Sequence, residues 1–290
     1  MSAALVFGAA GQLGAVMVDR LAAGGREVVA VTRREIDVTD HDAVTAAVAG
    51  PRPSLVVNCT AFNDVDGAES QPAVALDVNA FAVRSMARAA AAVDATFVHY
   101  STDFVFDGRA TEPYRELDRP SPESVYASSK LLGEWFAADA PRHYVLRVAS
   151  LFGGPAARSS IDRIVDALVA GRQARVFVDR VVSPSYVDDV AAATLALVSR
   201  EAPHGLYHCV NSGVTTWAEL GRAVARLLGV DGALLAPVKV DDVIMKARRP
   251  KYAALSNARL RDAGVEMPGW EDAIARHLLK RRESGGAARR

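Results

Sequence analysis

The chain has 290 residues, which is long enough to bury a substantial hydrophobic core in one large domain or in two closely joined ones. Half of its residues are apolar, and 34 basic residues balance 34 acidic ones, so the formal net charge is zero. This composition is that of an ordinary globular protein, and it gives no electrostatic sign of nucleic-acid binding or of an acidic membrane surface.

The cysteines and the start of the chain indicate a protein of a reducing compartment. Cys59 and Cys209 form neither a disulfide framework nor a zinc-binding pattern, and the six histidines are scattered, so we expect no metal. Residues 1–5 lead into an apolar run without the basic region of a signal peptide. The longest apolar stretch, near residues 190–198, is far shorter than the ~20 residues of a membrane span. We expect a cytoplasmic protein that contacts no membrane.

The first predicted strand, residues 4–7, is followed at once by a glycine-rich turn and a helix over residues 12–23. This order is the context that a dinucleotide-binding fingerprint requires. The first glycine would permit the tight turn, the second the close approach of the pyrophosphate, and the third close packing of the helix. The helix start would offer free N–H groups to the phosphates, and the turn lacks the Gly-Lys-Ser/Thr ending of a P-loop. The expected cofactor contacts here are Gly8, Gly11, Gln12, Leu13 and Gly14.

The second predicted strand, residues 27–32, ends in Arg33 and Arg34. Many NAD-selective folds place an acid at this point, whereas an arginine suits the 2′-phosphate of NADP. Two solvated surface arginines are an equally good interpretation, and the nearby Glu35 weakens the distinction. We expect Arg33 to bind NADPH, with NADH as the alternative.

Polar residues follow two further predicted strands, residues 55–58 and 96–100. In open α/β sheets, ligands bind at the carboxyl ends of the strands. A hydroxyl after the second of these strands could bond a substrate carbonyl, although a capping or turn role is the alternative. A long helix over residues 72–92 connects the two strands. The expected site residues are Cys59, Thr60 and Ala61 after the first strand, and Ser101, Thr102 and Asp103 after the second.

Tyr126 and Lys130 are four residues apart in a predicted helix and therefore share one of its faces. An ammonium beside a phenol favours the phenolate, so Lys130 is expected to lower the pKa of Tyr126 from its free value of about 10. Such a tyrosine can donate a proton to a carbonyl that is being reduced. For these two residues alone, a core tyrosine followed by a solvated lysine is the simpler interpretation.

A strand over residues 144–148 completes a regular alternation of strands and helices, which predicts an α/β fold with a doubly wound parallel sheet of the Rossmann type. Later helices are expected near residues 187–199, 217–228, 257–263 and 270–281. We therefore expect a dinucleotide-binding domain over residues 1–182 and a smaller, mostly helical substrate domain over residues 183–280. The helix over residues 187–200 should pack back on the first domain, and residues 281–290 should form a flexible basic tail. Arg249 lies in a loop and could serve a phosphorylated ligand, although a solvated charge is the alternative.

Together, the glycine turn, residues 101–103 and the Tyr126/Lys130 pair resemble the extended short-chain dehydrogenase/reductases. Residues 57–62, 65–69, 101–108 and 249–250 narrow the resemblance to the dTDP-4-dehydrorhamnose reductase family, over nearly the whole chain to about residue 280. That family reduces the C4 ketone of a dTDP-6-deoxyhexulose with NADPH or NADH. The resemblance therefore implies a nucleotide-sugar substrate, and it leaves a homodimer open.

The resemblance also implies roles for single residues. Thr102, Tyr126 and Lys130 would be catalytic: the tyrosine would protonate the carbonyl oxygen as hydride arrives, the lysine would bind the nicotinamide ribose, and the threonine would orient the carbonyl. Supporting cofactor positions would be Asp37 and Val38 at the adenine, Cys59 to Ala61 along the cofactor, and Asn79 at the neighbouring loop. Substrate positions would be Ser101, Thr102, Asp103, Phe104, Leu151 and Arg249.

Two positions depart from the family pattern. Phe104 stands where the family commonly has tyrosine, and Leu151 where it commonly has tryptophan, which removes a hydrogen-bonding hydroxyl and a broad stacking surface. Sites built around sugar hydroxyls discriminate through such groups, so the hexulose is left open. The alternatives are another deoxysugar ketoreductase, a nucleotide-sugar epimerase with retained NAD, and a regulatory subunit like the beta subunit of methionine adenosyltransferase.

Overall fold

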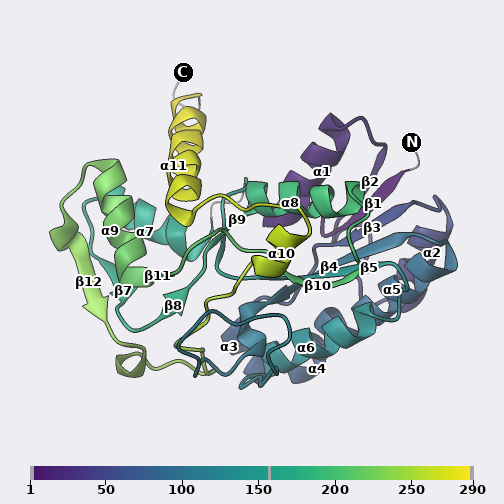
Figure 1. Cartoon of the computed structure of the whole chain (residues 1–290), viewed down its shortest axis with the longest axis horizontal. Helices are drawn as coiled ribbons and strands as arrows, with labels where there is room; N and C mark the ends of the chain where they lie inside the picture. Colours follow the sequence, from purple (N-terminus) through teal and green to yellow (C-terminus); the bar gives the residue numbers. More distant parts are fainter. Residues whose placement is uncertain (1–2, 156–157, 288–290) are drawn as a thin grey trace.

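The computed structural model describes residues 3–155 and 158–287, and a six-stranded sheet forms its centre (Figure 1). Every neighbouring pair in this sheet is parallel, in the order β10-β5-β4-β3-β1-β2. Its strands are β1 (Ala4–Phe7), β2 (Val28–Val31), β3 (Leu55–Asn58), β4 (Thr96–Thr102), β5 (His143–Val148) and β10 (Gly205–His208). The expected doubly wound parallel sheet is confirmed.

Helices cover both faces of the sheet, which explains why its strands are continuous apolar runs in the sequence. On one face, α1 (Gln12–Ala23) and α8 (Val187–Ser199) share a core with the strands. On the other face lie α2 (His41–Ala49), α5 (Ala82–Ala92) and the end of α6 (Val125–Ala137). Every residue of β1 and β3 is buried as a result.

The helix expected over residues 72–92 is divided into three parts. After α3 (Val65–Ser70), the chain forms α4 (Pro72–Leu76), then a π-helical turn η1 (Asp77–Phe81), and then α5. The sequence pattern does not reveal this turn, because a single wider turn scarcely changes the apolar periodicity. The turn contains the buried Asn79.

A second hydrophobic core lies beside the sheet, on the left of Figure 1. It is built by α7 (Ser160–Val169), β7 (Ala174–Phe177), α9 (Trp217–Leu228), β12 (Leu235–Val238) and α11 (Trp270–Ala287). The shorter elements around it and the site are η2 (Asp103–Val105), β6 (Leu151–Phe152), β8 (Val181–Val182), β9 (Ser185–Tyr186), β11 (Thr215–Thr216), η3 (Gly232–Leu234), η4 (Val240–Asp242) and α10 (Ala258–Asp262).

The division of the chain between the two cores differs from the boundary expected at residue 182. Elements α7 and β7 precede that residue but pack in the second core, whereas β10 follows it and pairs with β5. Helix α8 packs against α1, in the core that it shares with the sheet. The tail expected to be flexible from residue 281 is helical as far as Ala287, and Arg281 forms ion pairs with Asp162 and Asp166 of α7.

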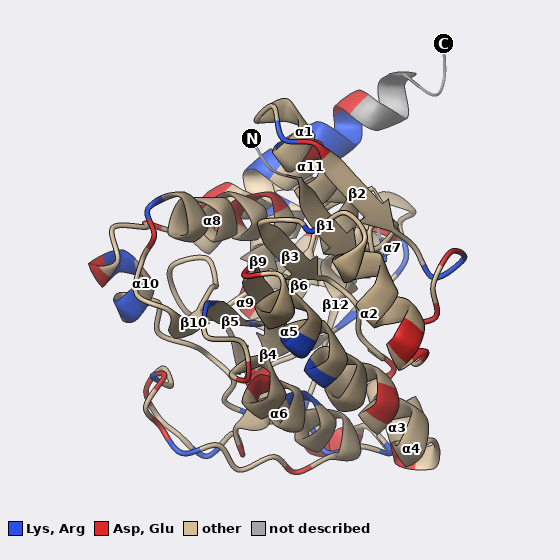
Figure 2. Cartoon of the chain, turned by 90° about the vertical axis from the view of Figure 1, so that its right-hand side faces the viewer, with Lys and Arg blue, Asp and Glu red and all other residues tan. Residues whose placement is uncertain are grey.

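Acidic and basic residues are interspersed over the side of the molecule shown in Figure 2, where neither sign dominates. The acidic and basic residues, which are equal in number in the sequence, are thus also mixed in space on this side of the molecule. Within residues 3–155 and 158–287, no helix combines the length and the apolar character needed to cross a bilayer.

Candidate active site

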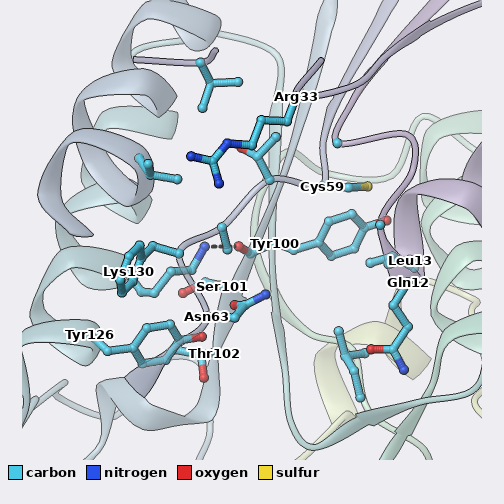
Figure 3. A pocket seen from close by; sticks show the side chains of 18 of the residues that line it. Gln12, Leu13, Arg33, Cys59, Asn63, Tyr100, Ser101, Thr102, Tyr126 and Lys130 are labelled. Carbon is cyan, nitrogen blue, oxygen red and sulfur yellow. Dashed lines mark hydrogen bonds between the residues drawn. The ribbon is translucent and has the colours of Figure 1, made fainter. Parts of the chain in front are cut away.

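A cavity of about 1000 Å³ lies at the carboxyl ends of β1, β3 and β4 (Figure 3). The strand order reverses here, because β2 lies on one side of β1 and all later strands of the sheet lie on the other. Such a switch point is where doubly wound sheets bind ligands. The expected site residues that line the cavity are Gly8, Gly11, Gln12, Leu13, Arg33, Asp37, Val38, Cys59, Thr60, Ala61, Ser101, Thr102, Asp103, Phe104, Tyr126, Lys130 and Leu151.

The glycine turn forms one wall of the cavity, and each of its glycines has a different reason to lack a side chain. Gly8 has φ 76°, and a Cβ there would come within 2.9 Å of the Cys59 backbone. A Cβ on Gly14 would lie 2.1 Å from the Gly8 carbonyl oxygen, so this glycine serves helix packing and does not itself line the cavity. Gly11 caps α1 without a side-chain partner, which leaves the first N–H groups of the helix for a ligand.

Arg33 extends into the cavity beyond the end of β2 (Figure 3), and it forms no salt bridge with any acid that the structure describes. Glu35 does not compete for it, because the Glu35 carboxylate accepts hydrogen bonds from the N–H and hydroxyl of Thr32, at 2.7 and 2.8 Å. These bonds lower the pKa of Glu35. The Asp37 carboxylate accepts hydrogen bonds from the N–H and hydroxyl of Thr39, which lower its pKa, and the nearby charge of Arg33 lowers it further without forming a salt bridge. The cation of Arg33 is therefore available to an anionic ligand.

Asn79 lies behind the cavity wall, where it holds the loop after β3 that we expected it to support. Its side-chain oxygen accepts from the N–H of Phe62 at 2.8 Å, and its amide donates to the Ser129 hydroxyl at 2.9 Å. A Cβ on Gly133 would lie 2.2 Å from the Asn79 carbonyl oxygen, so α6 can approach the π-helical turn only because this residue is glycine. Asn79 thus joins the loop after β3 to the helix that carries Tyr126 and Lys130.

The Tyr126 phenol and the Thr102 hydroxyl face one another at one end of the cavity (Figure 3). The Thr102 hydroxyl donates to the Asp103 carboxylate at 3.0 Å and accepts from the N–H of Phe104 at 3.2 Å. Burial raises the pKa of Tyr126 well above its usual value, although the bond with Thr102 opposes that shift. The phenol is therefore protonated at neutral pH, and the expected lowering of its pKa by Lys130 is not seen.

The side chain of Lys130 is buried, and residues of β4 contact its Nζ. Its Nζ donates to the carbonyl oxygen of Tyr100 at 2.6 Å and lies 3.4 Å from Nε2 of His99. Burial lowers the pKa of Lys130 to about 8, against the opposing charge of Glu134. Lys130 is consequently the group of this site whose pKa lies nearest to neutral pH on the basic side.

The Ser101 side chain is already engaged inside the protein. Its hydroxyl donates to Oε1 of Glu134 at 2.5 Å, and Glu134 also accepts two hydrogen bonds from Arg147, both at 2.7 Å. This buried ion pair joins β5 to α6, and the Ser101 hydroxyl joins the end of β4 to the same carboxylate. Ser101 thus lines the cavity with its hydroxyl donated to Glu134, whereas the Thr102 hydroxyl faces the Tyr126 phenol.

Phe104 connects Tyr126 with a residue that the sequence did not suggest, Arg180. Its ring is edge-on to Tyr126, and the guanidinium of the buried Arg180 lies 5.4 Å from its centroid. Burial raises the pKa of Asp103 to about 6, although the charge of Arg180 opposes that shift. Among the described residues, Oδ2 of Asp103 and Nε of Arg180 have no hydrogen-bond partner. No local pattern marks Arg180, because its position depends on packing far along the chain.

Arg249 lies outside the main cavity, contrary to expectation. Its guanidinium donates to both carboxylate oxygens of Asp66, at 2.9 and 2.8 Å, and thereby lowers the pKa of Asp66. It lines a separate cavity of about 410 Å³ together with Arg109, Arg248 and Lys251. The ion pair joins the loop after β12 to α3, so Arg249 stabilises the wall of the site from outside.

A family model described as RmlD substrate binding domain matches residues 2–282 of this chain. This chain belongs to the RmlD substrate-binding domain family. A dTDP-4-dehydrorhamnose reductase of Streptomyces griseus is 37% identical over 279 residues, which cover 93% of this chain and 91% of the relative. A probable dTDP-4,6-dihydroxy-2-methyloxan-3-one 4-ketoreductase of Streptomyces antibioticus is 36% identical over 273 residues, with coverages of 93% and 92%.

Among solved structures, dTDP-4-dehydrorhamnose reductase of Bacillus anthracis str. Ames in complex with NADP superposes with a TM-score of 0.91. It is 28% identical and covers 97% of this chain and 100% of its own. The resemblance inferred from the glycine turn, the residues after β4 and the Tyr126/Lys130 pair is therefore confirmed at the level of the RmlD family.

Proposed function

We propose that this chain reduces the C4 ketone of a dTDP-4-dehydro-6-deoxyhexose with NADPH, and that dTDP-4-dehydrorhamnose, reduced to dTDP-L-rhamnose, is its substrate. The observation that supports this most directly is the meeting of Thr102, Tyr126 and Lys130 at one end of a cavity whose other walls are a dinucleotide turn and Arg33. Relatives named as dTDP-4-dehydrorhamnose reductases match nearly the whole chain.

The hydrogen-bond donors and the cation at the wall of the cavity suit the phosphates of NADPH. The N-terminus of α1, capped only by Gly11, offers N–H groups to the pyrophosphate, and Arg33 offers a cation to the 2′-phosphate. The absence of a Cβ on Gly8 lets the turn after β1 pack directly against the backbone after β3, which brings both segments to the edge of the cavity. Asp37 and Val38 would bound the adenine, and Lys130 would bind the nicotinamide ribose. When bound, NADPH supplies the hydride that reduces the ketone.

In this proposal the protein supplies orientation and one proton. Thr102, whose hydroxyl faces the Tyr126 phenol, orients the substrate carbonyl. Tyr126 transfers its phenolic proton to the oxygen of that carbonyl as the carbon accepts hydride, so the ketone becomes an alcohol and the tyrosine a phenolate. The high pKa of Tyr126 keeps the acid protonated before the reaction. Such a phenol is in the protonation state that reduction requires, whereas oxidation of the alcohol would require the phenolate.

A 4-ketoreductase for another deoxysugar is the second candidate, and two observations favour it. Phe104 and Leu151 line the cavity where the resemblance leads one to expect tyrosine and tryptophan. A relative from Streptomyces antibioticus, similar over 93% of this chain, is named for a different dTDP-ketosugar. An epimerase is less well supported, because the unpaired Arg33 suits a phosphorylated cofactor that is released after each turnover.

The test is NADPH consumption by the purified chain, followed by nicotinamide absorbance, with dTDP-4-dehydrorhamnose and with a second dTDP-4-keto-6-deoxysugar. Robust consumption with the first would establish the rhamnose assignment, and a strong preference for the second would establish the other ketoreductase. Tyr126→Phe is the matched control: we expect it to lower kcat by about 10²- to 10⁴-fold, the usual contribution of a positioned acid, with NADPH affinity unchanged. Wild-type turnover in that variant would remove Tyr126 from the mechanism.

We also propose that the reaction takes place in the cytoplasm, since Cys59 and Cys209 are both free thiols. A homodimer is the oligomeric state we propose for the active protein, by resemblance to the family. Light scattering coupled to size-exclusion chromatography measures it directly, and a monomer at the concentrations of the activity assay would contradict it.

A further inference from the structure

Arg180 is a buried cation without a salt bridge. It is 9% exposed, and in the described part of the chain no acid lies within ion-pair distance of its guanidinium and no group accepts a hydrogen bond from its Nε. Burying a charge without such partners is costly, so other contacts must offset that cost. Arg180 is not among the residues that line the two cavities described above, which argues against direct contact with a ligand.

The backbone of Arg180 is fixed by the part of the chain that builds the second core. It lies between β7 and β8, and its carbonyl oxygen accepts from the N–H of Trp217, the first residue of α9, at 3.4 Å. The next residue, Val181, donates to the carbonyl oxygen of Lys251 at 2.7 Å and accepts from the N–H of Ala253 at 2.8 Å. The Arg180 side chain therefore extends from a rigid support toward the site.

The first group that the Arg180 side chain meets is the ring of Phe104. Its guanidinium lies over this ring, 5.4 Å from the centroid. The same ring is edge-on to Tyr126, with centroids 5.7 Å apart. A cation over the face of an aromatic ring is attracted by the ring quadrupole, so it opposes rotation of the ring away from this orientation. Arg180 thereby fixes the ring against which the Tyr126 phenol packs.

The second group is the Asp103 carboxylate, which attracts Arg180 over a longer distance than a salt bridge. The charge of Arg180 opposes the rise in the pKa of Asp103 that burial causes, and the charge of Asp103 opposes the fall in the pKa of Arg180. Arg249, a like charge, acts on Arg180 in the opposite direction. Oδ1 of Asp103 accepts from the Thr102 hydroxyl at 3.0 Å, so a carboxylate held by Arg180 also holds the Thr102 side chain.

Asp103 and Phe104 are consecutive residues of η2, and each supports a different hydroxyl of the site. We propose that Arg180 is a positioning residue that holds η2 in place from the second core, and thereby keeps the Tyr126 phenol and the Thr102 hydroxyl facing one another. This inference rests on the proposed function in taking these two hydroxyls as the groups that meet the substrate carbonyl. It explains why a buried cation is retained here without a salt bridge.

The kinetic test compares variants of Arg180 in the full-length chain. Arg180→Met removes the charge and keeps a long, unbranched side chain. Because a misplaced reacting group lowers turnover rather than affinity, we expect kcat to fall about 10-fold, with KM for the ketosugar and the dissociation constant of NADPH unchanged. Arg180→Lys keeps a cation that can lie over Phe104, so it should recover most of this loss. Arg175→Met, at an exposed position of β7, is the matched control and should leave kcat unchanged.

Three kinetic outcomes would overturn the inference. One is an unchanged kcat in folded Arg180→Met. Another is a loss of kcat that is equally large in Arg180→Lys, since the positive charge would then have no part in it. The third is a higher KM for the ketosugar at unchanged kcat, which would make Arg180 a substrate contact rather than a positioning residue.

A measurement without substrate separates this inference from the proposed function. In the chain with ¹³C-labelled tyrosine, the ring signals of Tyr126 are assigned by NMR from their loss in Tyr126→Phe. Arg180→Met should move these signals and Arg175→Met should not, whereas unmoved signals in Arg180→Met would overturn the inference. This outcome does not depend on whether dTDP-4-dehydrorhamnose is turned over.

The wild type provides the test if the Arg180 variants do not fold. In the chain with ¹⁵N-labelled arginine, the Nε–H of Arg180 should exchange slowly with solvent and show nuclear Overhauser contacts to the ring of Phe104. A rapidly exchanging Nε–H without these contacts would overturn the inference.

Discussion

The ring of Phe104 lies edge-on to the phenol of Tyr126, with centroids 5.7 Å apart and ring planes at 88°. The guanidinium of Arg180 lies over the same ring of Phe104, so a cation, an aromatic ring and the Tyr126 phenol are neighbours in a row. This contact places Phe104 where it can affect both the position of the Tyr126 phenol and the space that remains for a sugar in the cavity. Phe104 therefore lies between Arg180 and the Tyr126 phenol.

Phe104→Tyr should change the preference among ketosugar substrates more than it changes the turnover rate with any single substrate. A hydroxyl there can bond a sugar hydroxyl, and one such bond changes discrimination by about 10-fold. We expect kcat/KM to rise for dTDP-4-dehydrorhamnose relative to a second dTDP-4-keto-6-deoxysugar. The ratio of the two kcat/KM values is the measurement, with Phe104→Leu as the control that removes the ring and adds no hydroxyl. An unchanged ratio in the tyrosine variant would show that this position does not contact the sugar.

Arg33→Ala should weaken NADPH binding by about 10-fold or more, since a charge-assisted bond to phosphate is lost. NADH has no 2′-phosphate, so its affinity should change little. Both dissociation constants can be measured by nicotinamide fluorescence, and Arg34→Ala provides the comparison for a neighbouring arginine. Equal losses for the two cofactors would contradict the assignment of Arg33 to the 2′-phosphate.

Asp103 should make stability depend on pH. Its pKa of about 6 is above the usual 3.8, so between these values the folded chain holds a proton that the unfolded chain has released. The contribution of Asp103 to the free energy of unfolding therefore falls by up to about 3 kcal/mol as pH rises from about 4 to about 6. At higher pH this contribution is constant.

Asp103→Asn keeps the side chain neutral at every pH and removes this dependence. Relative to the wild type, the variant should gain in Tm between pH 4 and pH 7, as measured by calorimetry. A difference in Tm that is the same at both pH values would show that Asp103 is ionised across this range.

Gly133→Ala should destabilise the fold, because its Cβ would lie 2.2 Å from the Asn79 carbonyl oxygen. Either α6 or the π-helical turn must move, and such overpacking costs about 1–3 kcal/mol. Gly232→Ala is the matched control, since no atom lies within 4 Å of its Cβ position and its effect should stay within about 0.5 kcal/mol. Chemical denaturation of both variants measures the difference, and equal stability would show that α6 can shift freely.

The sequence was sufficient to predict the parallel sheet and most of the residues that line the cavity. Buried strands alternating with helices fix a parallel sheet, and such a sheet brings the carboxyl ends of β1, β3 and β4 to one edge. Residues directly after those strands were therefore predictable as cavity residues, including Gly8, Thr60 and Thr102. The four-residue spacing of Tyr126 and Lys130 placed both on one face of a helix.

Only the tertiary structure decided which partner each polar side chain meets. Ser101 donates to Glu134, and Arg249 pairs with Asp66, 183 positions away, so neither is free for the sugar. His99 is a strand residue like its neighbours until the register of β3 and β4 sets it between Asn58 and Lys130. Local periodicity tells which face of an element a residue occupies. The protonation of Lys130 and Asp103, by contrast, depends on burial and on neighbours brought together only by packing.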